Sequence, residues 1–332
     1  MNNAVGAGVR SVFLRVCAAA VAAVMLLIAG VGPGGGTEYD LRQPEACRLH
    51  FTVLSDVHIE TNNLPCYQIF VKSLQDVKRN RSGNDAVLFL GDSTMNGQLP
   101  ENLIFHGTVA RMLRGETVLP VMGNHDCGNG EGDFDKIQNR WFQFTAAFFG
   151  RRLEHPYYYE VINGFYCIVL GMEAQAVYEM QMSETQLAWL ADVLAQAAAS
   201  GKPAFVFSHF PTSCMTDETG AHSGRLAAML AEYNRTHDLI CFVGHYHTPL
   251  SMSSFRTNSG FPEIFVPRLT ELGGDDGHQP VPETGVGLVV EVYENEIAVR
   301  GRDFYRSTWK YDTARDVPCE VTYPLKTPIV SE

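Results

Sequence analysis

Short apolar runs alternate with longer amphipathic stretches along most of this 332-residue chain. The apolar runs have the length of buried strands, whereas the longer stretches repeat their apolar positions with the period of a helix. Strands are expected at residues 48–54, 86–90, 117–122, 203–208 and 239–244. Helices are expected at residues 66–79, 100–114, 134–149, 183–200 and 224–235. Strands that alternate with helices predict an α/β fold.

Two later segments predict β-hairpins. In residues 156–171, the pair Asn163-Gly164 separates two β-rich runs and is a strong hairpin signal. Residues 285–301 also contain two β-rich runs, with a turn near Glu294-Asn295. Hairpins added to an alternating core favour a single layered domain.

The N-terminal segment differs from the rest of the chain. Arg10 and Arg15 precede the apolar stretch 16–32, which has small residues near its end. This pattern predicts a secretory signal peptide over residues 1–30. The apolar stretch also reaches the lower limit for a spanning helix, so an N-terminal membrane anchor stays open. Either way we expect an exported protein, whether secreted, periplasmic or attached to the cell envelope.

These patterns predict the domain boundaries. The Gly-rich and then polar residues 31–46 indicate a linker. The α/β domain follows over residues 47–305, and residues 306–332 are expected to form a C-terminal tail.

Charge narrows the classes of partner. The formal net charge is −12, with 37 acidic against 25 basic residues. A broad basic surface for a nucleic-acid polymer is therefore not expected. A small phosphorylated substrate remains compatible, because bound metal ions can supply positive charge locally. The oligomeric state is left open.

Without the N-terminal segment, an odd number of cysteines remains, so at least one thiol has no intramolecular partner. In an oxidising compartment, Cys47 could pair with Cys66, or Cys127 with Cys214. The sequence leaves the connectivity open.

Polar clusters rich in metal-ligating residue types follow five of the predicted strands. In chain order they contain Asp56 and His58, then Asp92, then Asn124 and His125, then His209, and finally His245 and His247. In sheet-based α/β folds, ligands bind beyond the carboxyl ends of the strands. We therefore expect the five clusters to converge on one site.

The spacing within two clusters has a physical interpretation. In an extended chain, residues i and i+2 project to the same side. Asp56 and His58 can then both face a cation, and so can His245 and His247. The residue between the two histidines, Tyr246, points away. Oxygen and imidazole ligands together suit Mn, Fe, Zn, Ni or Co rather than Ca. Seven ligands exceed the needs of one tetrahedral ion but fit two ions about 3.5–4 Å apart with a shared carboxylate.

The ordered motifs D-x-H, G-D, G-N-H-D, a strand-end His and G-H-x-H resemble those of the calcineurin-like metallophosphoesterase family. The resemblance runs from about Arg48 to Pro249. It implies a four-layer α-β-β-α sandwich with two divalent or mixed-valence ions of Mn, Fe or Zn at the sheet edge. The implied ligands are Asp56, His58 and His247 for one ion and Asn124, His209 and His245 for the other, with Asp92 as the bridge. His125 would be the catalytic histidine, and His125 and Asn124 would contact the substrate.

Departures from the related subfamilies indicate the branch. Purple acid phosphatases have Gly where His58 stands and a Tyr ligand where Met95 stands. Calcineurin-type protein phosphatases have an Asp at the Met95 position that orients the catalytic histidine, so His125 needs another partner here; Asp126 is a weak candidate. The motifs most resemble the bacterial phosphodiesterase-like branch, including class III cyclic-nucleotide phosphodiesterases.

The resemblance implies hydrolysis of a small phosphodiester or phosphomonoester. A hydroxide that bridges the two ions would attack phosphorus in line, and His125 would protonate or stabilise the leaving alkoxide. Tyr246, His222 and His106 are further candidates near the substrate. Two alternatives are an envelope-anchored phosphatase for phospholipid or cell-wall polymer phosphate and a non-catalytic metal-binding module.

Overall fold

The computed structural model describes residues 30–32, 36–218, 224–273, 279–280 and 283–330. The predicted signal peptide or anchor therefore lies almost wholly outside the described residues. Among those that are described, none of the helices combines the length and the apolar character that a membrane crossing requires.

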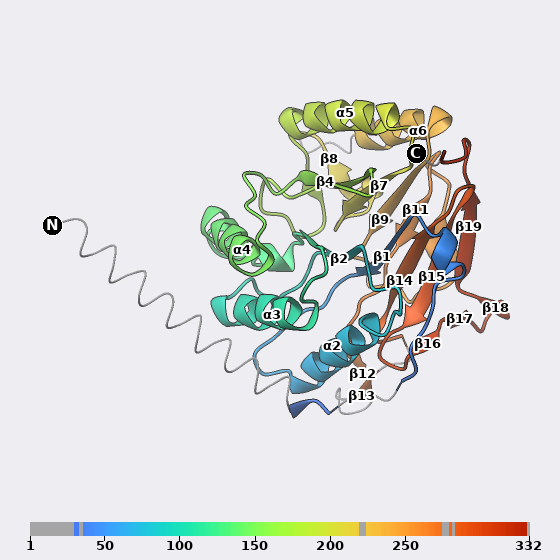
Figure 1. Cartoon of the computed structure of the whole chain (residues 1–332). Helices are drawn as coiled ribbons and strands as arrows, with labels where there is room; N and C mark the ends of the chain where they lie inside the picture. Colours follow the sequence, from blue (N-terminus) through green and yellow to red (C-terminus); the bar gives the residue numbers. More distant parts are fainter. Residues whose placement is uncertain (1–29, 33–35, 219–223, 274–278, 281–282, 331–332) are drawn as a thin grey trace.

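Two sheets form the centre of the molecule (Figure 1). The first has the order β16-β15-β14-β1-β2-β3, and β19 also pairs with β15. Its strands are β1 (Leu49–Leu54), β2 (Ala86–Leu90), β3 (Val118–Val121), β14 (Val286–Val292), β15 (Glu296–Asp303), β16 (Thr308–Trp309) and β19 (Glu320–Pro324). The second has the order β10-β11-β9-β7-β5-β4. Its strands are β4 (Tyr158–Ile162), β5 (Phe165–Val169), β7 (Ala204–Ser208), β9 (Leu239–Val243), β10 (Phe255–Arg256) and β11 (Glu263–Phe265).

The described residues form five α-helices, which are α2 (Leu64–Val77), α3 (Leu99–Met112), α4 (Phe134–Phe149), α5 (Glu184–Ala199) and α6 (Arg225–Thr236). Of these, α2 and α3 cover the first sheet and α5 and α6 the second, while α4 packs against α3. The remaining elements are the paired short strands β6 (Met180–Gln181) with β8 (Met215–Thr216), β12 (Leu272–Gly273) with β13 (Gln279–Pro280) and β17 (Tyr311–Asp312) with β18 (Val317–Pro318), and the 3₁₀ helices η1 (Pro44–Ala46), η2 (His125–Cys127), η3 (Thr212–Cys214) and η4 (Met252–Ser254). The expected helices and strands are confirmed to within about two residues.

Three apolar cores separate four layers. Phe51 from the first sheet meets Phe205, Phe207 and Phe242 from the second, so one core lies between the sheets. A second core joins the first sheet to α2 and α3, and a third joins the second sheet to α5 and α6. The central strands are buried on both faces, as is typical of parallel strands. The four-layer α-β-β-α sandwich predicted from the sequence is therefore confirmed.

Local sequence signals act as expected. The Ser183 hydroxyl accepts a hydrogen bond from the Gln186 amide at 3.0 Å and caps α5. Asn163 and Gly164 both have positive φ and connect β4 to β5 in an antiparallel hairpin. Strands β14 and β15 form the second predicted hairpin.

The predicted linker and tail differ from the structure. Tyr39 and Leu41, within the segment expected as a linker, are buried in the core beside α2. Strand β19, within the segment expected as a tail, pairs with β15 over five residues from Glu320 to Pro324. Both segments bury apolar side chains against the first sheet, so the folded unit extends beyond residues 47–305 at both ends.

Candidate metal centre

The clusters expected to converge do so at one edge of the molecule. Strands β1, β2 and β3 run parallel, and so do β5, β7, β9 and β11. Their carboxyl ends deliver Asp56, His58, Asp92, His209, His245 and His247 to two groups of side chains. Both groups include Asp92, and within each group one ligand atom per residue lies within 4.8 Å of the others.

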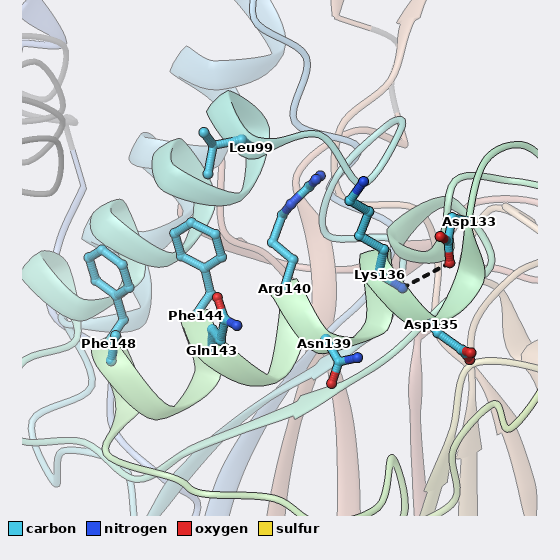
Figure 2. A pocket seen from close by; sticks show the side chains of 10 residues that line it. Leu99, Asp133, Asp135, Lys136, Asn139, Arg140, Gln143, Phe144 and Phe148 are labelled. Carbon is cyan, nitrogen blue, oxygen red and sulfur yellow. Dashed lines mark hydrogen bonds between the residues drawn. The ribbon is translucent and has the colours of Figure 1, made fainter. Parts of the chain in front are cut away.

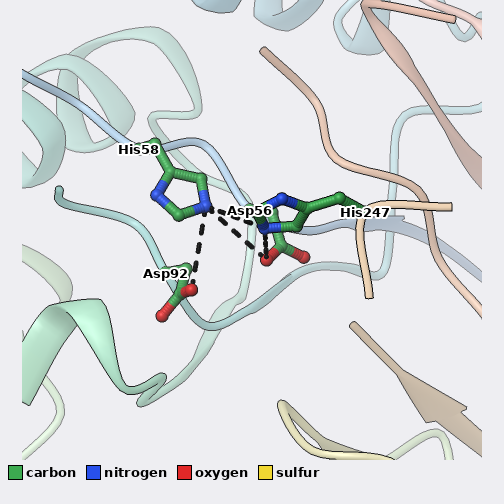
Figure 3. A group of neighbouring side chains, drawn as sticks. All are labelled: Asp56, His58, Asp92 and His247. Carbon is green, nitrogen blue, oxygen red and sulfur yellow. Dashed lines mark hydrogen bonds and ion pairs between the residues drawn. The ribbon is translucent and has the colours of Figure 1, made fainter. Parts of the chain in front are cut away.

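The first group consists of Asp56, His58, Asp92 and His247 (Figure 3). Nε2 of His247 lies 3.0 Å from Oδ1 of Asp56 and 3.1 Å from Nε2 of His58. Nε2 of His58 lies 3.7 Å from Oδ2 of Asp92. Two imidazole nitrogens that face each other beside two carboxylates form a donor set suited to a transition metal ion.

The second group consists of Asp92, His209 and His245, with Asn124 beside them. Nε2 of His209 lies 3.3 Å from Oδ2 of Asp92 and 2.9 Å from Oδ1 of Asn124. Oδ1 of Asn124 is also 3.2 Å from Nδ1 of His245, whereas its amide nitrogen donates to Asn129 at 2.9 Å. The hydrogen bond to Asn129 thus turns the amide oxygen of Asn124 towards the two histidines.

The charge balance of the site fits a bound cation. Asp56 and Asp92 are 0% and 1% exposed, and within the described part of the chain their ion-pair partners are histidines alone. Although burial raises it, hydrogen bonds from His247 and His58 hold the pKa of Asp56 well below its usual range. Burial lowers the pKa of His209, but the carboxylate of Asp92 raises it to about 9. Two buried carboxylates without a Lys or Arg partner need positive charge from another source.

The backbone at the ligands contradicts the extended conformation inferred from the spacing. Five ligand candidates have a left-handed φ: Asp56 (53°), His58 (48°), Asp92 (49°), His245 (69°) and His247 (52°). The side chains of Asp56 and His58 do meet, with 3.7 Å from Oδ1 to Nε2, but through left-handed turns rather than through strand alternation. His245 and His247 belong to different ligand groups. Such a conformation costs about 1–2 kcal/mol per non-glycine residue, and strain of this kind clusters at functional sites. Tyr246 points away as expected and is 44% exposed.

Two glycines in the motifs allow the close approach of ligand loops. A Cβ atom at Gly123 would lie 2.2 Å from Oδ1 of Asp92. A Cβ atom at Gly244 would lie 2.2 Å from the hydroxyl of Ser55 and 2.8 Å from Oδ2 of Asp56. A larger residue at either position would displace a carboxylate of the site.

His125 has a partner that sequence reasoning missed. Its Nδ1 lies 2.7 Å from the backbone carbonyl oxygen of Met95, and its backbone amide donates to Oδ1 of Asp92 at 2.9 Å. The His125 ring packs edge-on against His58. Because Nδ1 donates to a carbonyl, Nε2 is left to exchange a proton. No side-chain signal marks this partner, since any residue at position 95 supplies a carbonyl.

Asp126, the weak candidate for that partner, has a different role. Its carboxylate accepts hydrogen bonds from the amides of Ser93, Thr94 and Gly123 and from the Thr94 hydroxyl. Burial raises the pKa of Asp126 to about 6. Asp126 therefore ties the loop after β2 to the loop after β3 and holds Asp92 in position.

The three further candidates for a place near the substrate have different surroundings. His106 is fully buried, with its ring near Phe105, Phe144 and Phe149, so it is not placed to contact a substrate. His222 lies outside the described residues. The ring of Tyr246 stacks on Phe265, and its hydroxyl lies 3.0 Å from the Cys214 thiol.

Neither of the two disulfides that the sequence allows, Cys47–Cys66 and Cys127–Cys214, is present. All seven described cysteines are free, including Cys47, Cys66, Cys127 and Cys214. Cys127 is fully buried, and its sulfur lies 4.0 Å from that of Met172.

A hollow of about 560 Å³ lies elsewhere, between the start of α3 and one face of α4 (Figure 2). Lys136 and Arg140 line one part of it, and Leu99, Phe144 and Phe148 line another. None of the candidate ligands borders it, so it is separate from the metal centre.

Solved structures with low sequence identity align over most of the chain. One is a predicted phosphoesterase from Streptococcus pneumoniae TIGR4, with 13% identity, a TM-score of 0.37 and coverage of 83% of this chain and 97% of that chain. Another is the 5'-nucleotidase from Candida albicans SC5314, with 11% identity, a TM-score of 0.42 and coverage of 87% and 52%. A third is an archaeal phosphodiesterase, with 10% identity, a TM-score of 0.35 and coverage of 83% and 100%.

No curated protein matches this chain in sequence. The model of the calcineurin-like phosphoesterase family matches residues 49–249. This match spans the five strands whose ends carry Asp56, Asp92, Asn124, His209 and His245. The chain belongs to the calcineurin-like phosphoesterase family and is a hydrolase.

Proposed function

We propose that this protein hydrolyses a small phosphoester with the help of two transition metal ions that share the carboxylate of Asp92. The observation that carries the proposal is the presence of Asp92 in both ligand groups. Its two oxygens also have different neighbours, since Oδ2 faces His58 and His209 while Oδ1 accepts the His125 amide. A carboxylate fixed in this way is suited to sit between two cations.

The other ligands divide between the two positions. Asp56, His58 and His247 would hold one ion, and Asn124, His209 and His245 would hold the other. When bound, the ions would supply an activated water as nucleophile and neutralise charge on the phosphate oxygens. The hydrogen bond from Nδ1 of His209 to the carbonyl of Leu90, at 2.7 Å, orients this ring for metal binding through Nε2.

His125 is the proposed acid for the leaving group. Its Nδ1 is engaged by the Met95 carbonyl, so Nε2 is the nitrogen that would give a proton to the departing alkoxide. Asn124 and His125 lie next to each other at the start of η2 and would both contact the substrate phosphate. Membership in the phosphodiesterase-like branch stays a prediction.

The test is hydrolysis by metal-reconstituted protein of phosphomonoesters, cyclic nucleotides and glycerophosphodiesters. We expect turnover that requires metal, and a loss of at least about a thousandfold in Asp92→Asn. Asp192→Asn is the matched control, because it makes the same chemical change on the exposed surface of α5. Turnover by Asp92→Asn equal to that of the Asp192→Asn control would overturn the shared-carboxylate proposal.

We also propose export directed by residues 1–30, with either cleavage or retention as an anchor through residues 16–32. The support is the pattern of Arg10, Arg15 and the apolar stretch in the sequence. Mass spectrometry of the protein isolated from its producing cells distinguishes the two. A mature protein that begins near residue 31 indicates cleavage, and a full-length protein in the membrane fraction indicates an anchor. Full-length protein in the cytoplasm contradicts export.

A further inference from the structure

Arg268 lies beside the metal centre, and neither the proposed ligand set nor the proposed acid explains it. The chain leaves β11, crosses from the second sheet to the first and places Arg268 against Ser55, the residue before Asp56. The Leu269 amide donates to the Ser55 carbonyl at 2.9 Å and fixes this position. Strand β11 is parallel to β9, so Arg268 follows a strand end at the same edge that delivers His245 and His247.

The side chain of Arg268 lacks a partner within the described part of the chain. Among the residues that the structure describes, Arg268 donates no hydrogen bond and forms no ion pair, and its Nε atom is buried. A buried N–H without an acceptor costs about 1–3 kcal/mol. Arg302 differs from Arg268, because its Nε and Nη2 atoms donate to both oxygens of Asp76. An arginine that only stabilises the fold is expected to have such a partner.

The backbone at Arg268 lies against the loop that carries Asp56, the first ligand candidate of the metal centre. Among the described residues no carboxylate forms an ion pair with Arg268, and Asp56 and Asp92 pair with histidines instead. The guanidinium therefore adds positive charge to the site without cancelling any of its carboxylates.

We infer that Arg268 binds the phosphate group of the substrate and favours a phosphomonoester over a phosphodiester. This inference rests on the proposed function. Near pH 7 a phosphomonoester carries about two negative charges, whereas a diester carries one. A guanidinium binds two phosphate oxygens at once through its planar set of N–H donors. Such a donor improves the binding of the second charge of a monoester, which a diester lacks.

The first experiment measures binding of inorganic phosphate to the metal-loaded protein by isothermal titration calorimetry. We expect Arg268→Gln to weaken binding about tenfold and Arg268→Lys to weaken it less, because lysine retains the charge but not the planar pair of donors. Arg235→Gln is the matched control, since Arg235 is exposed on α6 and pairs locally with Glu232. Metal content must be equal in all four proteins. Equal phosphate affinity in Arg268→Gln and the control overturns the inference.

The second experiment compares p-nitrophenyl phosphate with bis-p-nitrophenyl phosphate. In Arg268→Gln, kcat/KM should fall about tenfold for the monoester and at most about twofold for the diester. An equal fall for both esters, or none for either, overturns the preference for monoesters. The free energy of unfolding without phosphate should not fall, because Arg268 has no partner to lose among the described residues. A clear fall in stability with unchanged phosphate affinity assigns Arg268 a structural role and overturns the inference.

The two proposals fail in different ways. A wild-type protein that hydrolyses neither ester when loaded with metal contradicts the proposed function. The phosphate titrations still decide the role of Arg268 in that case, because they do not depend on turnover.

Discussion

Two regions of this molecule bury carboxylates completely and treat them in opposite ways. Asp76 on α2 meets Arg302 on β15, with 2.5 Å from Nε to Oδ2 and 3.0 Å from Nη2 to Oδ1. The guanidinium of Arg302 also lies 3.8 Å from the ring centroid of Tyr39. In contrast, Asp56 and Asp92 face histidines and, among the described residues, have no Lys or Arg partner.

The difference separates a structural charge from a functional one. The Asp76–Arg302 pair is electrically complete and links a helix to the first sheet. Burial raises the pKa of Asp92, and the nearby charge of Asp56 raises it further, but His209 and His58 lower it overall. A protein retains such uncompensated charge where a ligand supplies the opposite charge.

The largest effect is expected from Asp56→Asn, which breaks the functional region alone. Hydrolysis should fall at least about a thousandfold, because a charged ligand is lost. The free energy of unfolding of the metal-free protein should fall by no more than about 1–2 kcal/mol, because Asn keeps an acceptor for His247 and loses only the charge of the contact. Steady-state kinetics and chemical denaturation measure both. A large loss of stability without metal would show that Asp56 is structural like Asp76.

Asp76→Ala is the reciprocal change. It leaves Arg302 buried without a partner, so the free energy of unfolding should fall by about 3–5 kcal/mol. Metal content and kcat of the folded protein should be unchanged, because Asp76 contacts no ligand of the site. The double variant Asp76→Leu with Arg302→Met should regain most of the stability, since a packed apolar pair replaces the ion pair. A loss of bound metal in Asp76→Ala would contradict the separation of the two regions.

Removal of metal tests whether bound metal stabilises the protein through Asp56 and not through the Asp76–Arg302 pair. At a free metal concentration of 100 to 1,000 times Kd, each bound ion should stabilise the wild type by about 3–4 kcal/mol. A chelator should abolish that increment in the wild type and in Asp76→Leu with Arg302→Met. Asp56→Asn should show a much smaller increment before chelation. Thermal denaturation with and without the chelator measures all three, and an equal increment in Asp56→Asn would show that Asp56 is no ligand.

The sequence predicted the metal centre better than it predicted the edges of the fold. Ligand types such as Asp56 and His209 are visible because they follow apolar strands, and parallel strands end at one edge. The left-handed backbone at Asp56 and His58 was not visible, because local spacing suits an extended chain equally well. The roles of the Met95 carbonyl and of Arg268 were not predicted either. A backbone acceptor has no sequence signal, and the lack of a partner for Arg268 among the described residues is a property of the folded chain.

The structure of the two terminal segments was also not predicted from the sequence. Residues 31–46 and 306–332 are rich in turn-forming and polar residues, which indicates irregular structure. Their pairing partners are Asn80 for Tyr39 and β15 for β19, and both are far away in sequence. Long-range pairing of short segments depends on tertiary context, which overrides local propensity.

The smallest expected effect is a change of stability with pH that comes from a buried histidine. Histidines, like carboxylates, differ between the metal centre and the structural core. His209 faces a carboxylate, whereas His106 is buried among aromatic rings, with Nδ1 2.9 Å from the Asn102 carbonyl and no partner for Nε2 among the described residues. Burial lowers the pKa of His106 to about 4. Below about pH 6.5, the unfolded chain binds a proton that the folded protein does not, so stability should fall as pH falls towards about 4. This loss should amount to roughly 1–3 kcal/mol.

His106→Phe removes the titrating group and keeps an aromatic ring at this position. Other groups titrate equally in both proteins, so the difference between their unfolding free energies isolates His106. That difference should move in favour of the variant by roughly 1–3 kcal/mol between pH 7 and pH 4, whatever the pH-independent cost of losing the hydrogen bond to Asn102. Urea denaturation at several pH values measures it. A difference that does not change with pH would mean that His106 takes up its proton in the folded state as readily as in the unfolded one, and the contrast with His209 would then not extend to the core.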